Sequence, residues 1–300
     1  MAQSTIAKLF VELGFNDQEF QSGVKGAGKG LSQLGAAGGQ LSNMFGGVVT
    51  KAFQAATVAI TGFATASAVV GARFEQEMAT VGAVTGANRV EMEALTDQAR
   101  KLGRDTTFSA TEAASAMQEL ARAGMDSNSV IQASAPALLL AGAAGSDMSV
   151  ATASMSATLA QFSLSAEDSG RVADVFSTAL KSSQFNLESL TEAMKFGGTV
   201  GAGFGMSLEE TVAAVAQFRD LGLEGSMAGT QFRMAMAAAA KVTAKGEKVL
   251  AKYGLTQAQI NPETNSFADI LRTVGEAGIG AKDSLEIFGT RSGANVALLA

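Results

Sequence analysis

The chain has 300 residues, with 22 Lys or Arg and 28 Asp or Glu, so its net charge is −6 at pH 7. It contains no His, Cys or Trp, which excludes disulfide bonds, thiol catalysis, zinc held by His or Cys, and Ser-His-Asp catalysis. The few, dispersed cations argue against specific nucleic-acid binding. We therefore expect a non-catalytic protein that holds no cofactor and no metal.

The composition favours helices. The sequence is rich in Ala and has 34 Gly but only 2 Pro and 1 Tyr, and Ala is the best helix former. We predict an all-α fold in three parts. These are a short strand-like segment at 1–19, a long apolar Ala/Gly-rich helical segment at 20–72, and a domain of short capped helices at 73–300.

The first segment alternates apolar and polar residues. Ala7, Leu9, Val11 and Leu13 fall on one side of an extended chain, which is the spacing of a strand. Charged residues such as Lys8 interrupt any apolar run here, so we expect no signal peptide and a start in the cytoplasm.

From Phe20 to Val69, alternate steps of four and three residues meet only apolar residues or Gly. A sustained repeat of 3.5 residues is typical of a coiled-coil seam, although an Ala/Gly-rich sequence can produce such a pattern by coincidence. Each Gly costs a helix roughly 1 kcal/mol relative to Ala, so this helix needs partners. We predict a homo-oligomer whose self-association seam consists of Phe20, Val24, Leu31, Leu34, Leu41, Phe45 and Val48.

The same segment is nearly uncharged. Between Leu31 and Ala72 the one charged residue is Lys51, and the 21 residues from Ala52 to Ala72 are long enough to span a bilayer. Polar residues such as Gln54 dilute this run. A buried helix or one that inserts into a membrane only conditionally, at residues 44–72, suits the composition better than a permanent transmembrane helix.

After Arg73 the sequence shows regular helix stops and starts. At four places a Gly is followed by an apolar residue, which is the pattern of a Schellman stop. Matching start signals occur at Ser109–Glu112, Ser165–Asp168, Ser207–Glu210 and Ser266–Asp269. The stops at 124, 163 and 205 lie roughly 40 residues apart, near the period of helical repeats, but three marks do not define a repeat. The predicted helix-stop glycines are Gly124, Gly205, Gly222 and Gly254.

Between these marks the apolar spacing is helical and predicts one stripe per helix for a common core. Pro136 fits poorly inside a helix, so we expect it to start a second helix within Ser129–Ala144. The apolar run that ends at Ala300 has no cap, which favours a fragment of a longer protein. The stripes are Met92, Leu95, Ala99 and Leu102; Ala113, Met117 and Leu120; Val172, Val175, Phe176 and Ala179; and Val212, Val215, Phe218 and Leu221.

Patterns that could carry chemistry have simpler explanations. The acidic pairs, for example Glu91/Glu93 and Glu209/Glu210, lie in predicted first helical turns, where carboxylates complement the helix dipole. The Gly-rich turn Gly222–Thr230 lacks the Lys of a phosphate-binding loop and follows no strand. We interpret it as a tight turn between helices with Ser226 as the N-cap.

Several motifs in order resemble the core region of phage tail tape measure proteins. The resemblance covers about Arg73 to Phe288, and the low-charge helical segment before it is also similar to what precedes that core in the family. The motifs are Phe74-Glu75, Met78–Val81, Leu102-Gly103, Thr106–Ala114, Leu120–Gly124 and Gly225–Thr230.

The resemblance implies a structural protein of a long-tailed phage or prophage. Such a protein is packed in the lumen of the tail tube, sets tail length during assembly in the host cytoplasm, and leaves before or with the DNA. Its implied partners are tail tube proteins and tail assembly chaperones, with transient contact to the host inner membrane on infection. The alternatives are a membrane-perforating helical protein and a cell-wall hydrolase that uses a single Glu.

Overall fold

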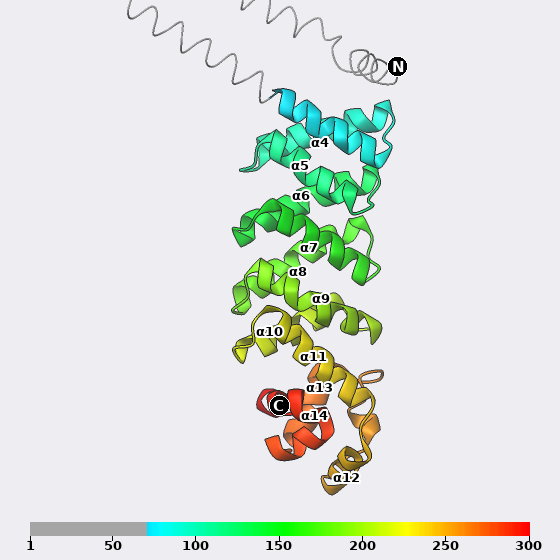
Figure 1. Ribbon diagram of the computed structural model, residues 1–300, viewed down its shortest axis with the longest axis vertical. Coiled ribbons are helices and arrows are strands. Elements are labelled where there is room, and N and C mark those ends of the chain that lie inside the picture. Colours follow the sequence, from blue (N-terminus) through cyan, green and yellow to red (C-terminus); the bar gives the residue numbers. More distant parts are fainter. Residues whose placement is uncertain (1–70) are drawn as a thin grey trace, which may run out of the picture. The chain divides into compact units, whose positions relative to one another are not determined.

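The computed structural model describes residues 71–300, and every regular element in this range is a helix (Figure 1). The predicted all-α fold is thereby confirmed for these residues, whereas the predicted strand lies outside them. Residues 71–85 are helical. The elements that follow are α4 (Arg89–Asp105), α5 (Ala110–Arg122), α6 (Ser127–Ala144), α7 (Met148–Gln161), η1 (Ala166–Asp168), α8 (Ser169–Ser182), α9 (Leu187–Gly203), α10 (Leu208–Asp220), α11 (Gly225–Ala240), α12 (Ala244–Lys252), η2 (Gln257–Gln259), α13 (Phe267–Glu276) and α14 (Ala281–Leu299).

The helices α4 to α11 form two parallel rows. The even row is α4, α6, α8 and α10, and the odd row is α5, α7, α9 and α11, with each helix packed on the next helix of its own row. Apart from α8 and α9, successive helices also pack across the rows, so that the helices stack in chain order (Figure 1). This is the architecture of an α-solenoid, in which each repeat mainly contacts its neighbours.

Polar side chains join neighbouring helices within each row. In the even row, Gln98 Nε2 donates to Ser134 Oγ at 3.3 Å, and Arg171 forms two hydrogen bonds of 2.6 Å with the carboxylate of Glu209. In the odd row, a hydrogen bond of 2.8 Å links the hydroxyl groups of Ser154 and Thr191. These bonds fix how far one helix is displaced along the next.

The two edges of the stack are built from caps and stops. Four of the described α-helices begin with a reciprocal capping box, including Ser109 with Glu112 and Ser207 with Glu210. Of the remaining predicted starts, the Asp168 carboxylate accepts the Ser165 backbone N–H at 3.1 Å, and Ser266 Oγ accepts the N–H of Asp269 at 3.1 Å. Local hydrogen bonding thus marks where these helices begin.

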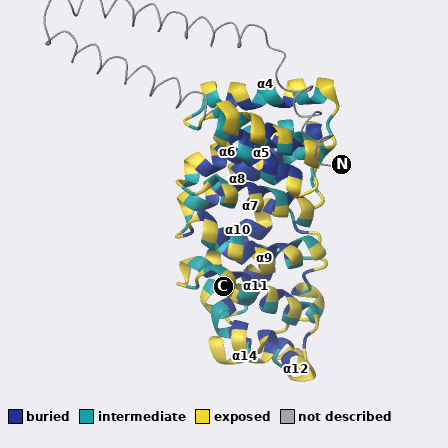
Figure 2. Cartoon of the chain, turned by 45° about the horizontal axis from the view of Figure 1, so that its top comes forward, coloured by how far each residue is buried: buried dark blue, intermediate teal, exposed yellow. Residues whose placement is uncertain are grey.

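Most residues of the apolar stripes lie on the inside of the stack (Figure 2), although Leu221 is 36% exposed. They form two clusters instead of the one common core that we expected. The first cluster joins residues 71–85 to α4, α5 and part of α6. The second extends from α6 to α14. Helix α6 contributes Leu138 to the first and Leu140 to the second, because its two sides face different neighbours.

Beyond α11 the regular stacking gives way to a terminal group made of α12, α13 and α14. Phe218 of α10, Phe232 of α11 and Phe267 of α13 meet with ring centroids 5.3 to 6.4 Å apart. Helix α14 bends at Gly289, which has φ 82° and ψ 163°, a conformation accessible essentially to Gly alone. The bend lets Ser284 Oγ donate to the carbonyl oxygen of Gly293 at 2.7 Å.

The structure corrects the prediction for Pro136. Helix α6 is continuous from Ser127 to Ala144 with Pro136 inside it. A proline in a helix leaves the carbonyl four residues earlier without its N–H donor. That carbonyl belongs to Gln132, and it accepts a hydrogen bond from Ser169 Oγ of α8 at 3.4 Å. Helix α8 therefore supplies the hydrogen bond that α6 cannot form by itself at Pro136.

The prediction of Ser226 as an N-cap is also wrong. Helix α11 already begins at Gly225, and its N-cap is Glu224, whose side chain makes no capping hydrogen bond. A Cβ added at Gly225 would lie 3.6 Å from the Cβ of Glu192 in α9, which is ordinary van der Waals contact. The start of α11 thus lies beside α9, one residue before Ser226.

Candidate interaction surface

The carboxylates of the predicted acidic pairs Glu91/Glu93 and Glu209/Glu210 take part in caps and ion pairs. Arg171 lowers the pKa of Glu209 through the hydrogen bonds between them, while Glu210 accepts the backbone N–H of Ser207 at 2.9 Å. Residues 71–300 contain no cluster of carboxylates arranged to bind a metal ion. No helix within this range is long and apolar enough to cross a membrane.

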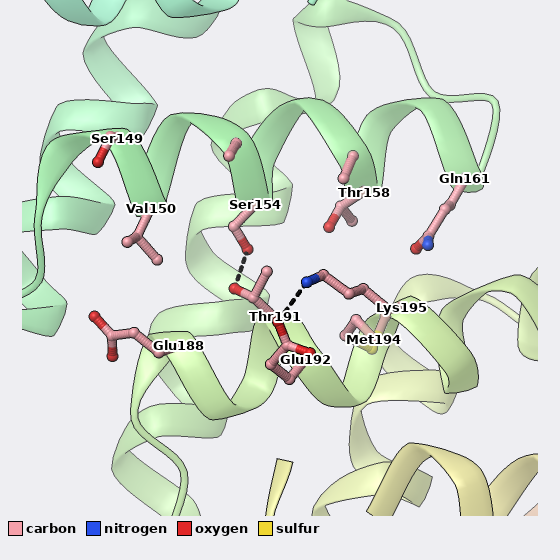
Figure 3. Close-up of a pocket in the computed structure, with 12 residues that line it drawn as sticks. Ser149, Val150, Ser154, Thr158, Gln161, Glu188, Thr191, Glu192, Met194 and Lys195 are labelled. Carbon is pink, nitrogen blue, oxygen red and sulfur yellow. Dashed lines mark hydrogen bonds and ion pairs between the residues drawn. The ribbon is translucent and has the colours of Figure 1, made fainter. Parts of the chain in front are cut away.

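A groove lies between α7 and α9, two neighbours in the odd row (Figure 3). Its volume is about 450 Å³. Helix α7 contributes mostly small side chains, so the two helices leave a hollow that larger residues would fill. The lining residues are Ser149, Val150, Ala153, Ser154, Ala157, Thr158 and Gln161 of α7, and Glu188, Thr191, Glu192, Met194 and Lys195 of α9.

The polar groups inside the groove are largely satisfied by one another. Ser154 and Thr191 share a hydrogen bond across it (Figure 3), and Thr191 Oγ1 also donates to the carbonyl oxygen of Leu187 at 2.7 Å. What remains open to a ligand is mainly apolar surface from Val150, Ala153 and Ala157. Such a surface suits an apolar side chain from a partner, because covering it releases water without leaving a polar group unpaired.

Charged residues border the groove along α9 alone. Glu192 pairs with Lys195 (Figure 3). Glu188, one turn earlier, forms no ion pair with any residue of the described range 71–300. The groove therefore has an apolar wall on α7 and an acidic border at the N-terminal end of α9.

The groove belongs to a hairpin that is almost free of charge. From Ser127 to Gln161, which covers α6 and α7, the one charged residue is Asp147. On α6 this hairpin exposes 63% of Leu139. A large apolar side chain exposed on an uncharged surface can mark an interaction site. Our sequence reasoning missed both features, although the missing charges are visible in the sequence.

The helix-stop glycines take left-handed conformations at helix ends. The φ angles of Gly124, Gly205, Gly222 and Gly254 are 94°, 74°, 87° and 74°. Each stop also shows the hydrogen bond from the following residue to the carbonyl five residues earlier, as from Met206 to Gly201 at 2.9 Å. These glycines shape the edges of the stack and do not converge on one site.

The residues predicted for the self-association seam lie outside the described residues. This holds for Phe20, Val24, Leu31, Leu34, Leu41, Phe45 and Val48. It also holds for almost all of the segment 44–72 that we considered for membrane insertion. Both remain predictions.

Comparisons with known proteins show the family of the chain. A profile of the phage-related minor tail protein family matches residues 96–289. The tape measure protein of Pneumococcus phage Dp-1 is 35% identical over 258 residues, which are 85% of this chain and 20% of that protein. The probable tape measure protein of Escherichia phage P2 is 30% identical over 204 residues, 67% of this chain and 25% of that protein. The chain therefore belongs to the phage-related minor tail proteins, in the family of tape measure proteins.

The chain spans only about a fifth to a quarter of the length of these two curated relatives. No solved structure matches it. The matched region contains most of the motifs that suggested the family from the sequence, among them Thr106–Ala114 and Gly225–Thr230. The resemblance drawn from those motifs is confirmed.

Proposed function

We propose that this chain is a structural part of a phage tail, acting as a scaffold and length ruler while the tail tube assembles. The similarity to two tape measure proteins, one of them over 85% of the chain, carries this proposal. A stack of capped helices suits such a role, because it presents a long surface to partners. We assign it no catalytic step, because the relatives that it matches are tape measure proteins.

The partners that we propose follow from this role. They are further copies of the chain, the tail tube protein and tail assembly chaperones, met first in the host cytoplasm and then in the lumen of the tail. We expect copies to associate through the seam of Phe20 to Val48. Changing Leu34 and Leu41 to Asp should then lower the mass seen in sedimentation, and an unchanged mass would rule out the seam.

Two deletions test the ruler and the folded stack separately. A helix rises 1.5 Å per residue, so removing the 14 residues from Leu31 to Met44 shortens an extended helix by about 21 Å and keeps a heptad register. We expect tails of normal or slightly reduced length in electron micrographs. Deleting Ser207–Leu221 removes α10 and takes Phe218 away from Phe232 and Phe267. We expect no tails from that variant.

A point variant separates loss of length from loss of folding. Phe218 is fully buried, so Phe218→Asp should disrupt the stack while leaving the number of residues unchanged. Absent tails from Phe218→Asp and from the Ser207–Leu221 deletion would assign an essential role to the folded stack. Tails of normal length from the deletion would refute that role.

A further inference from the structure

We propose that the groove between α7 and α9 receives Leu139 from a second copy of the chain, so that copies associate through two different surfaces. One surface is the exposed side of α6 around Leu139, which we call the knob. The other is the groove itself. The proposal concerns residues of the described stack and is independent of the seam of Phe20 to Val48.

Leu139, at the centre of the knob, is unusually exposed for a large apolar side chain. Leu139 is 63% exposed, although Leu138 and Leu140 on either side of it are fully buried. Its neighbours one turn away on α6, Ala135 and Ala143, are small, so the side chain projects beyond the surrounding surface. Leaving it in water costs free energy that a groove of suitable size recovers.

The groove offers an apolar surface that could bury Leu139. Its open wall consists of Val150, Ala153 and Ala157, and its volume of about 450 Å³ accommodates a branched apolar side chain. Leu139 of the same copy does not line this groove, because α6 belongs to the even row and the groove lies between two helices of the odd row. We therefore place the Leu139 of a second copy in it.

Charge supports a second copy as the partner. Glu188 borders the groove and has no cation within the described range 71–300. The helices that flank α6 in the even row end in basic residues, Arg104 in the last turn of α4 and Lys181 in the last turn of α8. Asp105 lies next to Arg104 and weakens its field, so we take Lys181 as the main partner of Glu188. The knob and the α7 wall of the groove come from the nearly uncharged stretch 127–161, so the charges at the contact are those of α9 and of the helices that flank α6.

Two different surfaces make a head-to-tail contact. Such contacts close into rings when the rotation between copies permits it and otherwise continue as filaments. In either case every copy uses its knob on one neighbour and its groove on the other. A symmetric dimer would instead bring two identical surfaces together.

Cross-linking between single-cysteine variants tests this geometry directly. The chain has no Cys, so each variant carries one thiol. Ala143→Cys places it beside the knob, and Ala160→Cys places it at the exposed end of α7 near the groove. With a short bismaleimide, we expect the mixture of the two full-length variants to give dimers joined from 143 to 160. The matched control is Val90→Cys, at an exposed residue of α4 away from both surfaces, mixed with Ala160→Cys.

Adding Leu139→Asp to the Ala143→Cys chain should lower the yield of the 143–160 product by about tenfold or more, since burial of a Leu is lost. Glu188→Lys in the Ala160→Cys chain should also lower the yield, and Lys181→Glu in its partner should restore it. Helicity of all variants should be unchanged because the altered residues are exposed. Products joined 143 to 143 or 160 to 160, or a 143–160 yield that ignores Leu139→Asp, would overturn the proposal, as would the absence of any cross-link.

Discussion

Ser169 Oγ lies 3.4 Å from the carbonyl oxygen of Gln132, and this contact explains how α6 tolerates an internal proline. Ser169 is the first residue of α8 and is almost fully buried. A side chain of α8 thus supplies the hydrogen bond that the proline removes from α6. This polar contact fixes α8 on α6 more specifically than apolar packing can.

This contact makes a prediction that can be tested in a double-mutant cycle. Ser169→Ala leaves the Gln132 carbonyl without a donor and should lower the free energy of unfolding by about 1 kcal/mol. In a Pro136→Ala background, residue 136 supplies its own N–H, so the same change should cost clearly less. Urea unfolding measures both differences. Equal costs in the two backgrounds would show that Ser169 does not act through Gln132.

The crossing of α9 and α11 depends on Gly229. A Cβ added there would overlap the carbonyl oxygen of Ala193 in α9, which cannot move without displacing the helix. Gly229→Ala should therefore lower the free energy of unfolding by about 1–3 kcal/mol. Gly170→Ala in α8 is the matched control, because a Cβ meets nothing within 4 Å there. That variant should be neutral or more stable by about 0.5 kcal/mol, and a similar loss in both variants would contradict a specific clash at Gly229.

The stop after α7 is strained at Ser163, the one non-Gly residue with positive φ in the described range, at 52°. The left-handed conformation costs an ordinary residue roughly 1 kcal/mol, so Ser163→Gly should raise the free energy of unfolding by about 0.5–1 kcal/mol. Gly205→Val at the corresponding stop after α9 should lower it by about 1 kcal/mol or more. Thermal scans of both variants check the opposite signs. Shifts in the same direction would count against these stops.

The free energy of unfolding should depend on pH through Asp283 of the terminal helices. Asp283 accepts hydrogen bonds from Lys252 Nζ at 2.7 Å and from Tyr253 Oη at 2.6 Å, and these bonds lower the pKa of its carboxyl group. A lowered pKa means that folding is stabilised above the unfolded value of about 3.9 and that this stabilisation disappears as pH falls through the folded value. Wild type should exceed Asp283→Asn in stability at pH 7, and the difference should shrink below about pH 4. A difference that stays constant down to pH 2 would exclude this ionisation.

Local signals in the sequence predicted the local structure well. Ser109 with Glu112 and Ser207 with Glu210 form capping boxes because cap chemistry involves residues three apart in the chain. Apolar spacing correctly marked Leu95, Met117, Phe176 and Phe218 as buried. It could not show that the helices stack in two rows, because the choice of neighbour depends on contacts between residues roughly 35 to 40 positions apart.

The missed features have the same origin. Continuous helix at Pro136 depends on Ser169, a residue 33 positions later in the sequence. The groove depends on small residues of α7 lying opposite Thr191 and Glu188 of α9. Sequence periodicity reports one helix at a time, so it detects the stripe that each helix buries but not the hollow left between two of them.

The division of the apolar interior at α6 has a mechanical consequence. The main contacts of α4 and α5 in the stack are with each other, α6 and α7, so under tension the first cluster can separate without disturbing the helices beyond α7. That cluster should peel from α6 while the rings of Phe218, Phe232 and Phe267 stay together, and force spectroscopy should record this as a separate early step. A chain that yields in this way lengthens one hairpin after another, without ever losing its whole fold at once.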